Sequence, residues 1–144
     1  MNTMTKFVRI VLIVLTIFLA LSAVAGGIQL LEGTYAPPIE MLNGFFKDYA
    51  IPGLALGLIV GGSATFAAFL LIRKSPFATL FAATAGIIIM FFEFDEVLVI
   101  GSPVGMARNL QIFYFGLGTL IVIFSMAAWF LELRGQLGRQ PGRG

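Results

Sequence analysis

Three acidic residues end a long apolar run in the segment MFFEFDEVLVIG, which spans residues 90–101. On a helix, Glu93 and Glu96 share one face because they are three positions apart, whereas Asp95 lies on nearly the opposite side. An unpaired carboxylate in apolar surroundings is costly, so it takes up a proton or finds a polar partner. The segment therefore indicates either a structural ion pair or a site that holds a proton or a ligand.

Arg108 is the cation that follows these acids most closely, after the short turn GSPVGM. We expect Glu93 to pair with Arg108, with Gln111 as the substitute partner. Because ion pairs also stabilise ordinary helical bundles, a structural role is favoured over a ligand or proton site, which stays open. The candidate polar cluster, structural or ligand-binding, comprises Glu93, Glu96, Arg108, Gln29, Gln111 and Tyr114.

The composition places these residues in a membrane protein. Residues of the AVILMFWYC set make up 59% of the 144 residues, and charged residues only 11%, whereas soluble domains carry about 25% charged residues. Four apolar segments are long enough to cross a bilayer core, which needs about 20 helical residues. We therefore predict an all-α fold, a four-transmembrane-helix bundle within residues 1–132, followed by a flexible Gly- and Arg-rich tail at 133–144. The predicted spans are about 7–31, 51–72, 77–97 and 110–131.

Local signals mark the helix ends. In RKSPF, Ser75 is the expected N-cap of the third helix, with Pro76 at the first helical position. In ARNLQ, Asn109 is the expected N-cap of the fourth helix.

The placement of lysine and arginine predicts the orientation of the bundle, because positive residues favour the cytoplasmic side. Both termini are expected in the cytoplasm, and the 32–50 and 98–109 loops outside, in a multi-pass protein of the bacterial cytoplasmic membrane. Residues 6–27 also read as a signal peptide with a small Ala-Val-Ala before Gly26, but the apolar run continues to Leu31, which favours a retained helix. The expected cytoplasmic residues are Lys6, Arg9, Arg73, Lys74, Arg134, Arg139 and Arg143, against Lys47 and Arg108 outside.

Small residues recur every four positions in the second segment and again in the third. In lipid, helices associate by close backbone approach at such residues. We expect the second and third helices to pack together through them, and internal packing is favoured over a dimer interface. The predicted packing residues are Gly53, Gly57, Gly61, Ala64, Ala82 and Gly86.

Three sequence stretches carry a family resemblance: GGIQLL, FFKDYAIPGLALGLIVGG and LQIFYFGLG, with F-x-D-Y-x-I-P-G the most specific pattern. Through them the chain from Gly26 to Glu132 resembles a family of small four-helix bacterial integral membrane proteins of unknown function. That family often carries a tryptophan before the acidic or amide positions of the third helix, where this chain has the phenylalanines of MFFEFDE. The resemblance implies an architecture and no activity.

The sequence disfavours an enzyme, because it contains no histidine, no cysteine, no nucleophile elbow and no phosphate loop. We expect no cofactor and no metal site, and no nucleic-acid partner, because the basic residues form no patch. The predicted function is that of an accessory or scaffolding subunit in the lipid bilayer, with a protein partner or a second copy. The alternative is a small homo-oligomeric transporter or channel that uses outer-leaflet carboxylates.

Overall fold

The structure, a computed structural model, describes residues 2–33 and 38–138. Helices and short connections make up this part of the chain, and no strand occurs in it, which confirms the all-α prediction. The second long helix is continuous but contains a π-helical segment, a rare feature in which the hydrogen bonds span one extra residue. In chain order the elements are α1 (Thr3–Glu32), the 3₁₀ turn η1 (Ile39–Leu42), α2 (Ala50–Leu54), the π segment η2 (Ala55–Val60), α3 (Gly61–Ile72), α4 (Ala78–Ile100) and α5 (Met106–Gly138).

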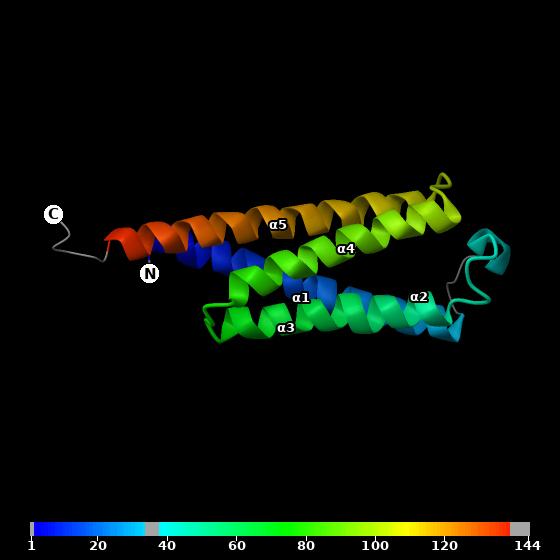
Figure 1. The fold of residues 1–144 in the computed structure, drawn as a ribbon, viewed down its shortest axis with the longest axis horizontal. Helices are drawn as coiled ribbons and strands as arrows, with labels where there is room; N and C mark the ends of the chain where they lie inside the picture. The colour runs from blue at the N-terminus through cyan, green and yellow to red at the C-terminus, as the bar shows by residue number, and fades with distance from the viewer. Residues whose placement is uncertain (1, 34–37, 139–144) are drawn as a thin grey trace.

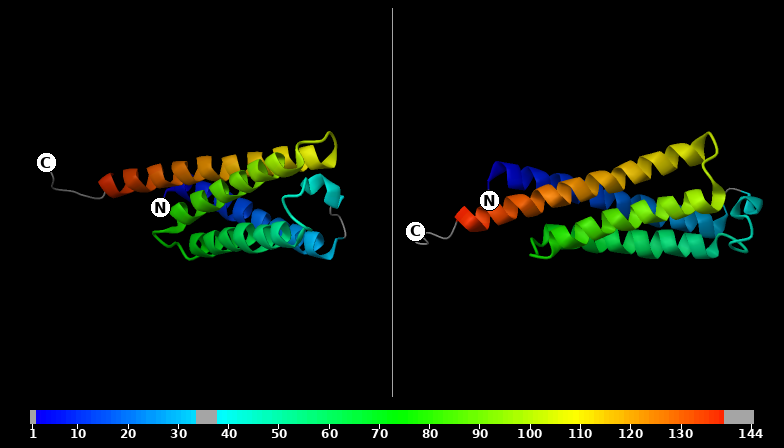
Figure 2. Two further views of the ribbon diagram at one scale, coloured as in Figure 1. Left: turned by 45° about the vertical axis from the view of Figure 1, so that its right-hand side comes forward. Right: turned by 45° about the horizontal axis from the view of Figure 1, so that its top comes forward.

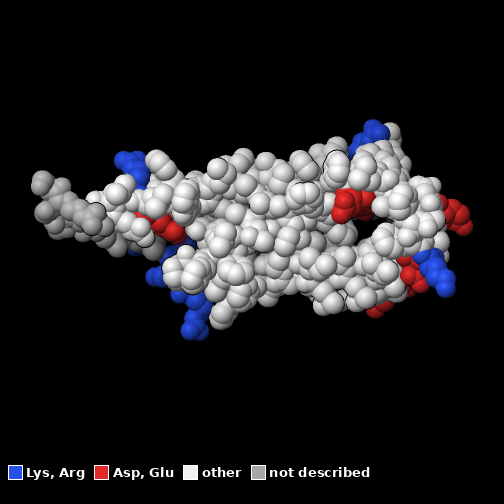
Figure 3. Space-filling view, viewed as in Figure 1, with Lys and Arg blue, Asp and Glu red and all other residues white. Residues whose placement is uncertain are grey.

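The long helices alternate in direction, so that both ends of the described chain lie at one end of the bundle (Figures 1 and 2). α4 and α5 form a hairpin, the 50–72 helix lies against α1 and α4, and α1 also contacts α5. Charged side chains gather at the two ends of the face shown in Figure 3, with an uncharged belt between them. We call one end the acidic pole, with Glu32, Glu40, Asp48, Glu93, Asp95 and Glu96, and the other the basic pole, with Lys6, Arg9, Arg73, Lys74 and Arg134.

Three helices of the described chain are long and apolar enough to cross a membrane: Thr3–Glu32, Ala50–Ile72 and Met106–Gly138. These coincide with three of the four predicted spans. The fourth long helix, α4, is not among them, and it is the helix that carries Glu93, Asp95 and Glu96.

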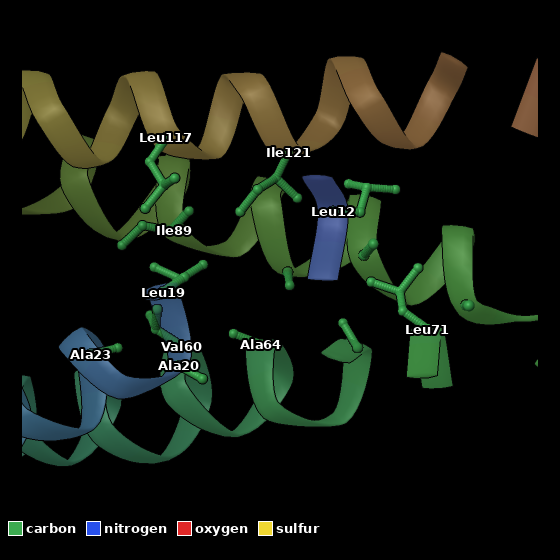
Figure 4. Close-up of a cluster of buried hydrophobic side chains, with 14 of the residues drawn as sticks. Leu12, Leu19, Ala20, Ala23, Val60, Ala64, Leu71, Ile89, Leu117 and Ile121 are labelled. Carbon is green, nitrogen blue, oxygen red and sulfur yellow. The ribbon is translucent and has the colours of Figure 1, made fainter. Parts of the chain in front are cut away.

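The centre of the bundle is a continuous apolar core shared by all the long helices (Figure 4). Two of the three buried serine and threonine residues, Thr16 and Ser125, are satisfied within their own helices. Thr16 donates to the carbonyl of Leu12 at 2.8 Å, and Ser125 donates to that of Ile121 at 2.6 Å. The fully buried large side chains include Leu12, Leu19, Leu71, Ile89, Ile121 and Val60.

Two predicted helix starts are wrong, and the second matters for the site. Phe77 takes the N-cap position of α4, and Ser75 instead accepts a hydrogen bond from the Phe77 amide at 3.2 Å in the preceding turn. α5 begins at Met106, so Asn109 lies inside its first turn and does not cap it. α5 also continues past the expected end at Leu131 to Gly138, and the rest of the predicted tail lies outside the described residues.

The glycines of the second helix pack against α1, not against α4 as predicted. A Cβ atom built on Gly27 of α1 would lie 2.7 Å from the carbonyl oxygen of Gly53 and 2.8 Å from the nitrogen of Gly57. Gly61 likewise faces Val24 of α1. The periodic small residues correctly mark a tight seam, but their spacing does not identify the helix on the other side.

Gly86 of α4 packs against α5 through a second close approach. A Cβ on Gly86 would lie 2.8 Å from the carbonyl oxygen of Gly118, and a Cβ on Gly118 would lie 2.7 Å from that of Gly86. This contact holds α4 and α5 together. The candidate polar residues of the two helices lie beyond it, at the acidic pole.

Candidate functional site at the acidic pole

Glu93 lies on the buried face of α4. That face consists of Ala82, Ala85, Gly86, Ile89 and Glu93, at the helical spacing expected from the sequence. The side chain of Glu93 is only 6% exposed, so the prediction that it is buried is confirmed. Its Oε2 atom is buried and has no hydrogen-bond partner.

Glu96, one turn further along α4, is half-buried and forms the second half of a carboxyl pair. The side chains of Glu93 and Glu96 lie within hydrogen-bonding reach of each other. Asp95, on the other side of the helix, is exposed. The helix therefore directs two of its three acids inward, as the spacing predicts.

Gln111 is the residue of α5 that reaches this pair. Its side chain is 4% exposed, its amide nitrogen donates to the carbonyl of Gly101 at 3.0 Å, and it lies near Glu96. The amide oxygen Oε1 is buried without a partner, like Oε2 of Glu93. The site thus holds two buried polar oxygens that nothing in the described chain satisfies.

The expected ion pair between Glu93 and Arg108 is wrong. The guanidinium of Arg108 folds back over its own turn and donates to the carbonyl of Ser102, from Nε at 3.0 Å and from a terminal nitrogen at 2.6 Å. Arg108 is exposed, and Glu93 makes no ion pair within the described residues. The early start of α5 explains this, because it leaves Arg108 in the first turn at the rim and carries Gln111 one turn deeper.

Gln29 and Tyr114 do not join the site. Gln29 is exposed near the end of α1, and Tyr114 packs against the apolar core, with its ring 5.2 Å from that of Phe113 in an edge-to-face contact. Neither forms a hydrogen bond with the carboxyl pair in the described part of the structure.

Two residues between α1 and α2, Asn43 and Tyr49, lie at this end of the bundle, as their expected depth predicts. Asn43 donates to the carbonyl of Val99 at 2.7 Å and so ties the loop to the end of α4. Tyr49 is buried and makes a long hydrogen bond, 3.5 Å, to the carbonyl of Pro38. Burial raises the pKa of Tyr49, and the nearby carboxyl of Glu96 acts in the same direction. Asn43 and Tyr49 lie within the stretch of resemblance or beside it, but only the folded loop shows that they reach α4.

This arrangement favours a proton over a metal ion as the occupant. Two carboxyl groups at hydrogen-bonding distance repel each other when both are ionised, and they attract when they share one proton. A hard cation such as calcium takes about 6–8 oxygen ligands, whereas the described residues contain no group of three or more His, Cys, Asp or Glu residues placed to hold a metal. Figure 3 shows an opening near the acidic pole with acidic side chains at its rim.

The observed contacts predict that loss of Gln111 destabilises the protein more than loss of Arg108. An ion pair between Glu93 and Arg108 would predict the reverse order. Arg108→Ala removes exposed hydrogen bonds to Ser102 and should lower the unfolding free energy by less than about 1 kcal/mol. Gln111→Ala leaves the Gly101 carbonyl without its side-chain donor and removes a buried amide, and it should cost about 1–3 kcal/mol. Unfolding both variants in mixed detergent micelles tests this order. A larger loss of unfolding free energy for Arg108→Ala than for Gln111→Ala would indicate that Arg108 pairs with Glu93.

No family model, no curated protein and no solved structure matches the chain. The family resemblance therefore stays a prediction.

Proposed function

We propose that this protein is a four-span membrane protein that serves as an accessory subunit of a larger membrane assembly and holds a proton at its acidic-pole site. The observation that carries the proposal is the buried Glu93 beside the half-buried Glu96: among the described residues no cation pairs with them, and Oε2 of Glu93 has no partner. A structural ion pair would have required Arg108 as the partner of Glu93, but Arg108 donates to Ser102 instead.

The connections of the bundle support four spans. α4 links the turn after α3 at the basic pole to the turn before α5 at the acidic pole. If its three long neighbours cross the membrane, α4 must cross with them. Its 23 residues at about 1.5 Å each give roughly 34 Å, enough for a hydrocarbon core of about 30 Å.

The apolar core supports a binding role over transport. Between the carboxyl pair and the basic pole, the buried residues described are Leu, Ile, Val, Ala and Gly together with Thr16 and Ser125, whose hydroxyls bond within their own helices. Transporters usually place ionisable residues near the bilayer midplane or interrupt their helices there. A proton at the acidic pole therefore has no polar route through one copy of this bundle.

The alternative function is a homo-oligomeric transporter or channel. It is favoured by the same unsatisfied oxygens of Glu93 and Gln111, which are typical of a site that exchanges an ion. A second copy would have to supply the polar route, because the described core is apolar.

The poles predict the orientation in a bacterial cytoplasmic membrane. Lysine and arginine concentrate at the basic pole, and the positive-inside rule assigns that end, with both termini, to the cytoplasm. A reporter fused after Gly144 should read cytoplasmic, and one inserted at residues 36–44 should read external. An external C-terminus would reverse the proposed arrangement.

The functional test uses the full-length protein in two settings. Extracted from its native membrane in mild detergent, it should migrate with a different protein in a fixed ratio. Reconstituted alone into vesicles, it should carry no proton flux that differs between the parent and Glu93→Gln. A lone symmetric oligomer with a flux that Glu93→Gln abolishes would overturn the accessory role and establish the alternative.

A further inference from the structure

A cavity with charged residues in its lining lies at the other end of the bundle, at the basic pole. It has a volume of about 90 Å³ and is formed by the start of α1, the α3–α4 turn, the first turn of α4 and the last part of α5. Its ionisable lining residues are Arg9, Lys74 and Glu132, two cations and one anion. The charge of this cavity is opposite in sign to that of the acidic-pole site.

Arg9 lines this cavity and has a donor that no other group uses. One terminal nitrogen of its guanidinium is buried and has no hydrogen-bond partner in the described structure. A guanidinium carries several donors in a planar fork that matches the oxygens of a phosphate or carboxylate. Glu132 lines the same cavity, but it forms no ion pair with Arg9 among the described residues.

The remaining polar groups of the cavity also suit an anion. Ser75 uses its oxygen to accept from the Phe77 amide, which leaves its hydroxyl hydrogen free to donate. Thr79 also lines the cavity, in the first turn of α4, where a long helix presents the positive end of its dipole. Lys74 adds a second cation.

Lys74 occupies a backbone conformation that normally favours glycine. Its φ is 55°, in the left-handed region, just after the end of α3. A lysine at such a position is strained relative to glycine. Lys74→Gly is therefore a variant that should fold at least as well as the parent while removing the cation.

We propose that the basic-pole cavity binds a phosphate group through Arg9 and Lys74, with Ser75 and Thr79 as additional donors. The phosphate belongs either to an anionic lipid headgroup or to a small soluble ligand. Basic pockets between helices on the cytoplasmic side are typical sites for anionic headgroups. The inference does not depend on the function proposed for the acidic pole.

Binding is tested on delipidated full-length protein in detergent, with short-chain phosphatidylglycerol and inorganic phosphate as separate probes. At least one probe should bind, and Arg9→Gln should weaken it by about tenfold or more, because a charged donor is lost. Lys74→Gly should weaken it by about fivefold with no loss of thermal stability. Lys6→Gln, which removes a charge at the same pole but outside the cavity, should change it by less than about twofold.

Glu132→Gln separates this proposal from a simple Arg9–Glu132 pair. If the cavity binds an anion, removing the carboxylate should strengthen binding by several-fold. A response to phosphatidylglycerol alone identifies a lipid headgroup, and a response to inorganic phosphate identifies a soluble ligand. Failure of both probes to bind, or equal binding by the Arg9→Gln and Lys6→Gln variants, would overturn the proposal.

Discussion

Gly27→Ala is expected to force α1 away from the 50–72 helix and to lower the unfolding free energy by about 1–3 kcal/mol or more. The new Cβ atom would lie 2.7 Å from the Gly53 oxygen, 2.8 Å from the Gly57 nitrogen and 2.9 Å from the Gly57 Cα atom. All three neighbours are backbone atoms, so no side chain can rotate to relieve the overlap. The helices themselves must separate.

Two alanine substitutions on the facing helix provide matched controls. A Cβ on Gly57 would meet Gly27 Cα at 3.9 Å, an ordinary contact, and a Cβ on Gly62 would meet nothing within 4 Å. Gly57→Ala and Gly62→Ala should therefore unfold close to the parent in mixed micelles, and both gain helix propensity. Equal stability of Gly27→Ala and Gly62→Ala would show that α1 does not approach the second helix this closely.

This prediction shows the limit of the small-residue pattern. The four-residue spacing of Gly53, Gly57 and Gly61 correctly indicates a face that contacts another helix. The choice of partner depends on how the helices cross in space, which spacing along one helix does not encode. The pair Gly26–Gly27 interrupts the apolar run of α1. This pair was the feature of the sequence that could have indicated α1 as the helix facing Gly53 and Gly57.

The acidic site was predictable to a similar extent. The helical period correctly places Glu93 on the face of Ala82 and Gly86, and an apolar run around a carboxylate indicates burial. The partner depended on where α5 begins, and helix ends are poorly specified by sequence. In the structure α5 starts at Met106, Arg108 donates to Ser102, and Gln111 is the buried polar residue of the first turns. Asn43 and Tyr49 are in a loop, whose path no periodicity predicts.

Glu93→Gln should remove the shared proton of the site with little loss of stability. An amide can replace the protonated carboxyl as donor and acceptor toward Glu96, so the buried hydrogen bonding is largely kept. We expect the unfolding free energy to change by less than about 1 kcal/mol, because no buried cation is left without a partner. Glu93→Ala, in contrast, leaves a cavity and an unpaired Glu96 and should cost more, about 2–3 kcal/mol. The comparison by unfolding in micelles distinguishes a proton-sharing pair from an ion pair, for which Glu93→Gln would be the damaging change.

The most direct test of the proton-sharing pair is an infrared difference spectrum of the protein in lipid nanodiscs at neutral pH. The parent minus Glu93→Gln should show the C=O stretch of a protonated carboxylic acid, and Glu96→Gln should remove or shift the same band. Glu40, which is exposed at the same pole, serves as the control, and Glu40→Gln should remove only carboxylate bands. If Glu93→Gln also removes only the bands of an ionised carboxylate, the pair holds no proton at neutral pH and the proposed site is wrong.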